Sequence, residues 1–174
     1  MSLFVPRGFS MRSLMFVLAS CSLLMGQQET QAANAARLIL VVGADGTTEY
    51  GERHRRWAEH WMRAAEKSVL SVTRIGVGVD EELADKGGMS DRDRFLQVLD
   101  DLGDVPDSDQ EAVDLGAVVW IVMIGHGTFA DGAAKFNLRG PDVEAKEIRA
   151  RLEKVALPIV LLNNSSSSGP FVNA

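Results

Sequence analysis

An unbroken apolar run at residues 117–124 constrains the fold of this chain more than any other feature. It reads Ala-Val-Val-Trp-Ile-Val-Met-Ile and is rich in β-branched residues. A strand with one face in water alternates apolar and polar side chains, so a continuous apolar run indicates a strand covered on both faces. Such strands are typical of parallel sheets with helices packed on both sides. The sequence therefore predicts an α/β protein with a buried strand at its centre.

Other segments alternate between strand and helix patterns along the chain. The expected strands span residues 38–42, 69–79, 117–124 and 157–162. The expected helices span residues 52–67, 90–102 and 141–155, where apolar side chains recur at helical spacing. Residues 135–138 are expected to form a short hairpin arm. This order predicts a three-layer α/β/α sandwich with a mainly parallel sheet, built as one domain from residues 36–174.

Polar turns follow three of the expected strands, at residues 43–46, 125–128 and 163–169. Ligands of parallel α/β sheets bind at the carboxyl ends of the strands, so a site is expected where these turns meet. His126 stands in the second turn between two glycines, which leave the backbone N–H groups open. A histidine there can act as a general base, and the Gly127 N–H can help to form an oxyanion hole. The alternative is a histidine that only caps the turn.

The third turn contains four consecutive serines, Ser165 to Ser168. Hydroxyl groups next to a strand end can act as a nucleophile or as hydrogen-bond donors. A flexible serine linker is the alternative, but a linker usually follows a complete domain. This run directly follows a predicted core strand, which favours a loop that forms part of a site.

The His-Gly turn and the serine loop together resemble the caspase and legumain clan of cysteine peptidases. In that clan an apolar strand ends in a His-Gly turn, and a helix and a second apolar strand with a short nucleophile loop follow. The resemblance covers roughly residues 37–174 and implies a caspase-like fold and a peptidase function. The legumain loop, acid-Ala-Cys-x-Ser-Gly, matches Ser168-Gly169 at its end, which places Ser166 at the cysteine and Asn164, an expected substrate contact, at the acid. The shorter caspase-type loop points to Ser167 instead.

Tyr50-Gly51-Glu52-Arg53-His54 resembles a second legumain stretch, Tyr-Asn-x-Arg-His. There the arginine helps to bind the substrate side chain and the asparagine orients the catalytic histidine. The match implies that Arg53 contacts substrate, while Gly51 has replaced the orienting asparagine. The alternative is a basic first turn of a helix that lies in solvent.

Residues 1–35 have the pattern of a secretory signal peptide: arginines, a short apolar run and small residues before the cleavage point. An exported protein, periplasmic or secreted, is therefore expected. Leu18-Ala19-Ser20-Cys21 also resembles a bacterial lipobox, so a lipoprotein anchored through Cys21 is the alternative. Cys21 is the one cysteine of the chain, and its removal leaves no thiol to act as the family's nucleophile.

Several classes of protein are disfavoured by composition. A net charge of −6 argues against nucleic acid as a partner, because phosphate binding needs clustered Lys and Arg. The apolar run of the leader is too short for a stable membrane span. No cofactor motif is present, and His54 and His60 are six residues apart on one helix, so neither a metal nor a cofactor is expected.

Three functions are compatible with these observations. The first is an exported peptidase homologue, degenerate or weakly active, with a His126–Ser166 pair in place of His–Cys. The second is a non-catalytic exported binding module that uses the same cleft for a peptide or protein partner; an unrelated α/β hydrolase is a third. The family's sheet continues past the nucleophile loop, so the domain is expected to be incomplete at its C-terminus or to expose a sheet edge that a partner covers.

Overall fold

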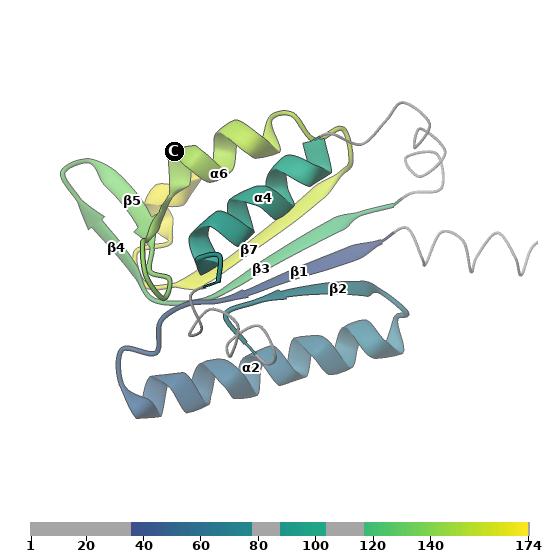
Figure 1. Ribbon diagram of the computed structural model, residues 1–174, viewed down its shortest axis with the longest axis horizontal. Coiled ribbons are helices and arrows are strands. Elements are labelled where there is room, and N and C mark those ends of the chain that lie inside the picture. The colour runs from purple at the N-terminus through teal and green to yellow at the C-terminus, as the bar shows by residue number, and fades with distance from the viewer. Residues whose placement is uncertain (1–35, 78–87, 104–116, 174) are drawn as a thin grey trace, which may run out of the picture.

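The computed structural model describes residues 36–77, 88–103 and 117–173, and its centre is a four-stranded parallel sheet (Figure 1). The strands are β1 (Arg37–Val42), β2 (Ser71–Ile75), β3 (Val119–Gly125) and β7 (Ile159–Ser165). Their order across the sheet is β2-β1-β3-β7, and every neighbouring pair is parallel. The predicted parallel α/β architecture is therefore confirmed. The apolar run at residues 117–124 forms most of β3, one of the two inner strands of the sheet.

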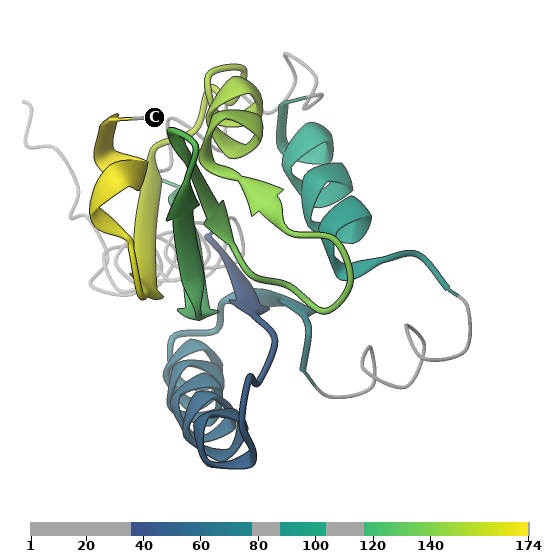
Figure 2. The same cartoon turned by 90° about the vertical axis from the view of Figure 1, so that its left-hand side faces the viewer.

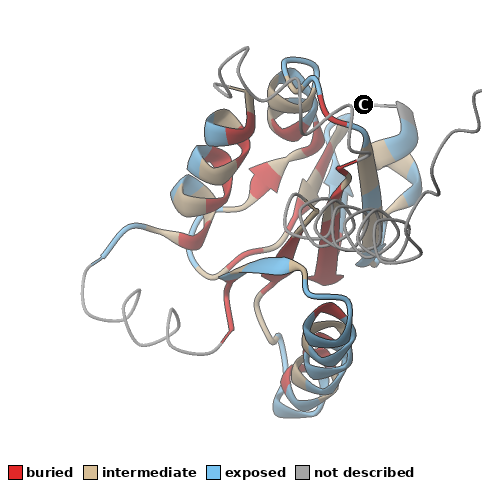
Figure 3. Ribbon diagram, turned by 90° about the vertical axis from the view of Figure 1, so that its right-hand side faces the viewer, coloured by how far each residue is buried: buried red, intermediate tan, exposed pale blue. Residues whose placement is uncertain are grey.

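Helices cover both faces of this sheet. Helix α2 (Thr48–Lys67) lies on one face, and α4 (Asp91–Gly103) and α6 (Ala145–Leu152) lie side by side on the other (Figure 1). Because alternate side chains of a strand point to opposite faces, the core divides into two clusters. Ile39, Ile121 and Met123 pack towards α4 and α6, whereas Leu40, Val122 and Ile124 pack towards α2. Figure 3 shows that buried residues follow the strands and the inner faces of the helices.

A small antiparallel sheet follows β3 directly (Figure 2). It consists of β4 (Gly127–Ala130), β5 (Ala133–Phe136) and β6 (Val143–Glu144). Asp131 and Gly132 join β4 to β5, both with positive φ, which is the conformation that an Asp-Gly hairpin turn favours. The predicted hairpin arm at residues 135–138 is therefore present, although its strand ends at Phe136.

Several element boundaries differ from the predicted ones. Helix α2 begins at Thr48 rather than residue 52, because the Thr47 side chain caps it by accepting from the Tyr50 N–H at 3.4 Å. Helix α6 begins at Ala145 rather than residue 141, after the short strand β6. Strand β7 continues to Ser165 rather than ending at residue 162, because its pairing with β3 continues to the end of that strand.

The expected signal peptide and lipobox at residues 1–35 lie outside the described residues. Within residues 36–77, 88–103 and 117–173, no helix is both long and apolar enough to cross a membrane.

Candidate functional site

The register of β3 and β7 brings the histidine turn and the serine loop to the same edge of the sheet. Gly125 is paired with Ser165, so His126 and Ser166 are the next residues of two neighbouring parallel strands. Neighbouring strands lie about 4.8 Å apart, so the two backbones are one strand spacing from each other at this point. The turn after β1 reaches the same edge, because Val42 is level with Ile124. The three turns predicted to meet at one sheet edge therefore do so.

The backbone of His126 is fixed by the segment that follows β5. The Asn137 N–H donates to the His126 carbonyl at 3.0 Å, and the Asn137 carbonyl accepts from the Ala44 N–H at 3.0 Å. The Asn137 side chain donates to Asp142 at 2.9 Å. Two residues further on, Arg139 pairs at 3.0 Å with Asp91, which is only 3% exposed. This segment therefore ties the end of β3 both to β1 and to the start of α4.

The His126 ring lies on the α2 side of β3. Its centroid is 4.8 Å from the Tyr50 ring and 5.2 Å from the His54 ring, edge to face in both cases. Gly46, with φ of +71°, leaves room for the ring, because a Cβ there would stand 3.1 Å from His126 Nε2. The ring therefore contacts both the β1–α2 turn and the first turns of α2.

The Ser166 hydroxyl makes two hydrogen bonds with the backbone of Gly127. It accepts from the Gly127 N–H at 3.1 Å and donates to the Gly127 carbonyl at 3.2 Å. A side chain on Gly127 would collide with this arrangement, since a Cβ would stand 2.3 Å from the Ser166 carbonyl oxygen. The hydroxyl proton therefore points to a carbonyl rather than to an imidazole, and the expected oxyanion donor is already engaged.

The other three serines have different surroundings. Ser165 donates from its hydroxyl to Asn163 Oδ1 at 2.7 Å. Ser167 is exposed and has φ of +56°, in the left-handed region that non-glycine residues seldom adopt. Ser168 lines a groove described below. Among the four, Ser166 is the one whose hydroxyl bonds to the histidine turn.

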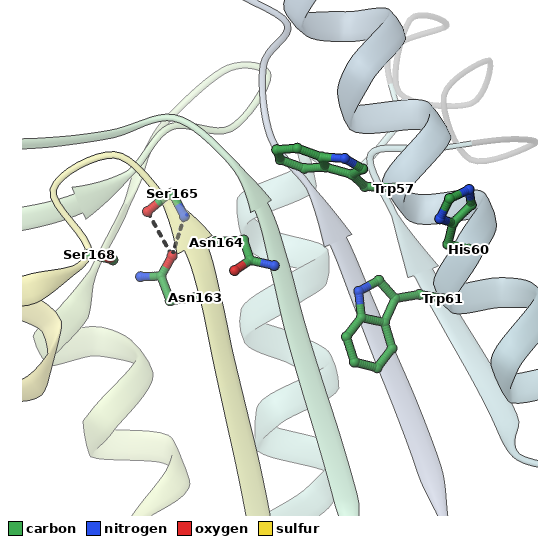
Figure 4. Close-up of a pocket in the computed structure, with 7 residues that line it drawn as sticks. All are labelled: Trp57, His60, Trp61, Asn163, Asn164, Ser165 and Ser168. Atoms are coloured by element: carbon green, nitrogen blue, oxygen red, sulfur yellow. Dashed lines mark hydrogen bonds between the residues drawn. The ribbon is translucent and has the colours of Figure 1, made fainter.

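A groove of about 580 Å³ lies between α2 and the carboxyl end of β7 (Figure 4). Helix α2 contributes two tryptophans and a histidine to its lining, and β7 with its loop contributes amides and hydroxyls. The lining residues are Trp57, His60, Trp61, Asn163, Asn164, Ser165 and Ser168. Trp57 is one of the apolar residues at helical spacing that predict this helix, yet 43% of its surface is exposed. Helical spacing alone does not separate a core stripe from a groove wall.

The two substrate contacts that the family resemblance implies lie on different elements: Arg53 in the first half of α2, and Asn164 near the carboxyl end of β7. Arg53 pairs with Glu49 at 2.9 Å, and its guanidinium lies 5.1 Å from the centre of the Tyr50 ring. Asn164 is exposed and lines the groove. The Tyr50 ring therefore contacts both the Arg53 guanidinium and the His126 ring.

His54 is a buried histidine for which the sequence indicates no functional role. It is 3% exposed, its Nδ1 has no hydrogen-bond partner among the described residues, and its ring meets that of His126. Burial lowers the pKa of His54, and the neighbouring His126 lowers that pKa further, while Asp45 opposes the shift. Gly51 makes room for Asp45, because a Cβ on Gly51 would stand 2.3 Å from that carboxylate. In the sequence, the cluster of the Tyr50, His54 and His126 rings was indicated only by the spacing of Tyr50 and His54, which stand four residues apart and so share one face of a helix.

The lowered pKa of His54 predicts a loss of stability in acid. The folded protein keeps His54 neutral, whereas the unfolded chain takes up a proton near the ordinary pKa of about 6.5. The free energy of unfolding is therefore expected to fall as the pH drops below that value. Urea unfolding at several pH values between 5 and 8 measures the effect, and His54→Phe should reduce the slope. His60→Phe, which removes an exposed histidine from the same helix, is the matched control; an unchanged slope in His54→Phe would contradict the assignment.

Comparisons of the chain with protein-family models, with curated proteins and with solved structures found no significant match. Within the part of the chain that the structure describes, no three His, Cys, Asp or Glu side chains are grouped closely enough to hold a metal ion.

Proposed function

We propose that this chain is an exported peptidase homologue of the caspase and legumain type, in which His126 and Ser166 take the places of the family's histidine and cysteine. The observation that carries the proposal is the pairing of Gly125 with Ser165, which makes His126 and Ser166 neighbours at the carboxyl ends of adjacent parallel strands. The order of strand, His-Gly turn, helix and strand with a nucleophile loop agrees with the family's layout.

The chemistry open to this pair is acyl transfer to serine. Ser166 Oγ would attack the carbonyl carbon of a peptide bond while His126 accepts the hydroxyl proton and then delivers it to the leaving amine. When Oγ bonds to that carbon, the Gly127 N–H loses its present partner and becomes free to donate to the oxyanion. Water would then release the acyl group and restore the serine.

The resting contacts support slow turnover. A serine hydroxyl ionises at far higher pH than a thiol, so it depends on a base that already accepts its proton. The Ser166 hydroxyl donates instead to the Gly127 carbonyl, and the His126 ring packs against Tyr50 and His54. Each turnover therefore requires these hydrogen bonds to break and the Ser166 hydroxyl to donate to the imidazole instead.

The two hydrogen bonds between Ser166 and Gly127 also support the alternative, a non-catalytic binding module. If the hydrogen bonds between Ser166 and Gly127 persist when a peptide binds, the serine loop is a structural part of the cleft. The groove beside α2 would then bind a peptide without cleaving it.

A fluorophosphonate probe, which reacts with activated serine hydroxyls, distinguishes the two functions. The full-length protein is expected to be labelled slowly, at a rate at least about a hundredfold below that of an efficient serine hydrolase, since base catalysis contributes factors of that size. Labelling should disappear in Ser166→Ala, fall strongly in His126→Ala and persist in Ser167→Ala, the matched control. Mass spectrometry of the labelled peptide checks the position. Absence of labelling in the folded protein would overturn the catalytic proposal in favour of the binding module.

A further inference from the structure

The small antiparallel sheet has a free edge that begins at the candidate site. Its strand order is β4-β5-β6, so β4 is paired on one side only. The hairpin of β4 and β5 projects beyond the carboxyl ends of the parallel strands (Figure 1). After Gly127, the remaining residues of β4 are exposed, and Phe129 is 55% exposed. No residue of β4 is a proline or carries a charge, the features with which proteins commonly protect such an edge.

The pairing of β4 with β5 determines which backbone groups point to this edge. In an antiparallel pair, bonded and non-bonded residues alternate, and a non-bonded residue directs its N–H and C=O away from the partner strand. His126 is bonded to Asn137, whose N–H donates to the His126 carbonyl at 3.0 Å. In this register Thr128 is the next bonded residue along the strand. Gly127 and Phe129 therefore direct their N–H and C=O groups outwards, to the free edge.

The Ser166 hydroxyl already occupies the first of these two outward positions. Its single oxygen accepts from the Gly127 N–H at 3.1 Å and donates to the Gly127 carbonyl at 3.2 Å. These are the two hydrogen bonds that a residue of an added antiparallel strand would make with Gly127. The second position, at Phe129, has no hydrogen-bond partner among the residues that the structure describes. The open position therefore stands about 6.8 Å along the strand from the one that the serine fills.

We propose that a peptide substrate binds as an added antiparallel strand along β4, with its backbone paired to Phe129 and its scissile carbonyl at Ser166. The inference rests on the proposed function, whose mode of substrate binding it specifies. An extended peptide carries N–H and C=O groups that need partners when they leave water, and Phe129 offers one partner for each. Because the added strand runs opposite to β4, the peptide residue opposite Phe129 precedes the residue at Ser166 by two positions.

The side chain of Phe129 favours an apolar residue at that position of the peptide. Directly paired residues of an antiparallel sheet share a face, and Phe129 is paired with Ala134, which is only 6% exposed. The exposed Phe129 ring therefore continues, at the edge, a face that is buried further in. A peptide side chain opposite Phe129 would lie on the same face and cover the ring. The substrate class is therefore an extended peptide with an apolar residue two positions before the residue whose carbonyl is attacked.

Amide hydrogen exchange in the free full-length protein, measured by NMR, tests the register before any peptide is added. The Phe129 N–H is expected to exchange at least about tenfold faster than the Thr128 N–H, because β5 supplies a partner for Thr128 alone. Equal protection of the two amides would overturn the inference, since the edge would then offer no free donor at Phe129.

Calorimetry with capped pentapeptides tests the pairing itself. The parent peptide is acetyl-Ser-Val-Ser-Ala-Ser-amide, in which valine stands two residues before alanine. N-methylation of the valine removes the N–H that would donate to the Phe129 carbonyl and is expected to weaken binding at least about tenfold. N-methylation of the serine between valine and alanine, whose N–H would face away from β4, is the matched control. It is expected to change the affinity less than about threefold.

Two substitutions at residue 129 separate the backbone from the side chain. Phe129→Ala removes the ring and keeps the N–H, so it should weaken binding of the parent peptide about threefold. Phe129→Pro also removes the N–H, and its binding should be at least about tenfold weaker than that of Phe129→Ala. An edge strand accommodates proline where the N–H faces outwards, and urea unfolding checks that both variants are folded.

Equal affinities of the two N-methylated peptides, equal affinities of the two folded variants, or no binding to the parent protein would overturn the inference. Fluorophosphonate labelling of the parent chain, measured in parallel, separates these outcomes from failure of the catalytic proposal. Calorimetry detects a paired peptide without acylation, and the probe reacts without a peptide strand, so either result can occur without the other.

Discussion

Replacing Gly127 with alanine is expected to destabilise the fold by about 3 kcal/mol and to detach the serine loop from the histidine turn. The added Cβ would stand 2.3 Å from the Ser166 carbonyl oxygen, 2.9 Å from Ser165 Oγ and 3.1 Å from the Lys135 carbonyl oxygen. The Lys135 carbonyl belongs to β5, which its pairing with β4 holds in place, whereas the Ser166 carbonyl belongs to the loop just past the end of β7. The strain therefore has to be relieved by moving the loop, which breaks both hydrogen bonds between Ser166 and Gly127.

Gly169→Ala is the matched control for this substitution. Gly169 follows the same serine loop, but a Cβ there would meet nothing within 4 Å. Its effect is expected to stay within about 0.5 kcal/mol. Urea unfolding measures both variants, and fluorophosphonate labelling of Ser166 should decrease in the Gly127 variant alone. Equal stability of the two alanine variants would show that the contact between β3 and the serine loop is looser than described.

The fold class could be predicted from the sequence because a strand that is buried on both faces of a sheet consists of consecutive apolar residues. The continuous apolar runs at residues 38–42 and 117–124 correspond to β1 and β3, whose side chains fill both core clusters. Ser90 stands at the start of the helix expected over residues 90–102, and its hydroxyl caps α4 by accepting from the Asp93 N–H at 3.1 Å. The carboxyl end of β7 was harder to predict, because Asn163 to Ser165 read as a loop. Pairing with β3 keeps these polar residues in the strand.

For the candidate site, the sequence predicted which turns lie together but not the directions of their side chains. The sequence indicated that the turn around His126 and the serine loop lie at one sheet edge, and the register agrees. It could not give the direction of the His126 ring, which depends on contacts with Tyr50 and His54 from a helix some seventy residues earlier. Nor could it show that Trp57 lines a groove, because the exposure of a helical side chain depends on which strands the helix covers.

Ser166→Cys is expected to create a reactive thiol that depends on His126. Residues 36–174 contain no cysteine, so the substitution, made together with Cys21→Ser, introduces a single thiol. An ordinary cysteine ionises near pH 8.5, and a nearby imidazole and a backbone N–H both favour the thiolate. In the proposed site the Gly127 N–H and His126 supply these two groups. The alkylation rate at pH 7 should rise roughly tenfold, since only a small fraction of an unperturbed thiol is ionised there.

Alkylation of this cysteine by iodoacetamide is the most direct test of the proposed pairing of His126 with Ser166. The control is Ser167→Cys in the same background, which presents an exposed thiol one residue further along the loop. The proposal predicts that Ser166→Cys reacts about tenfold faster than Ser167→Cys at pH 7 and loses this advantage when His126 is replaced by alanine. Equal rates for the two cysteines, unaffected by His126→Ala, would contradict it.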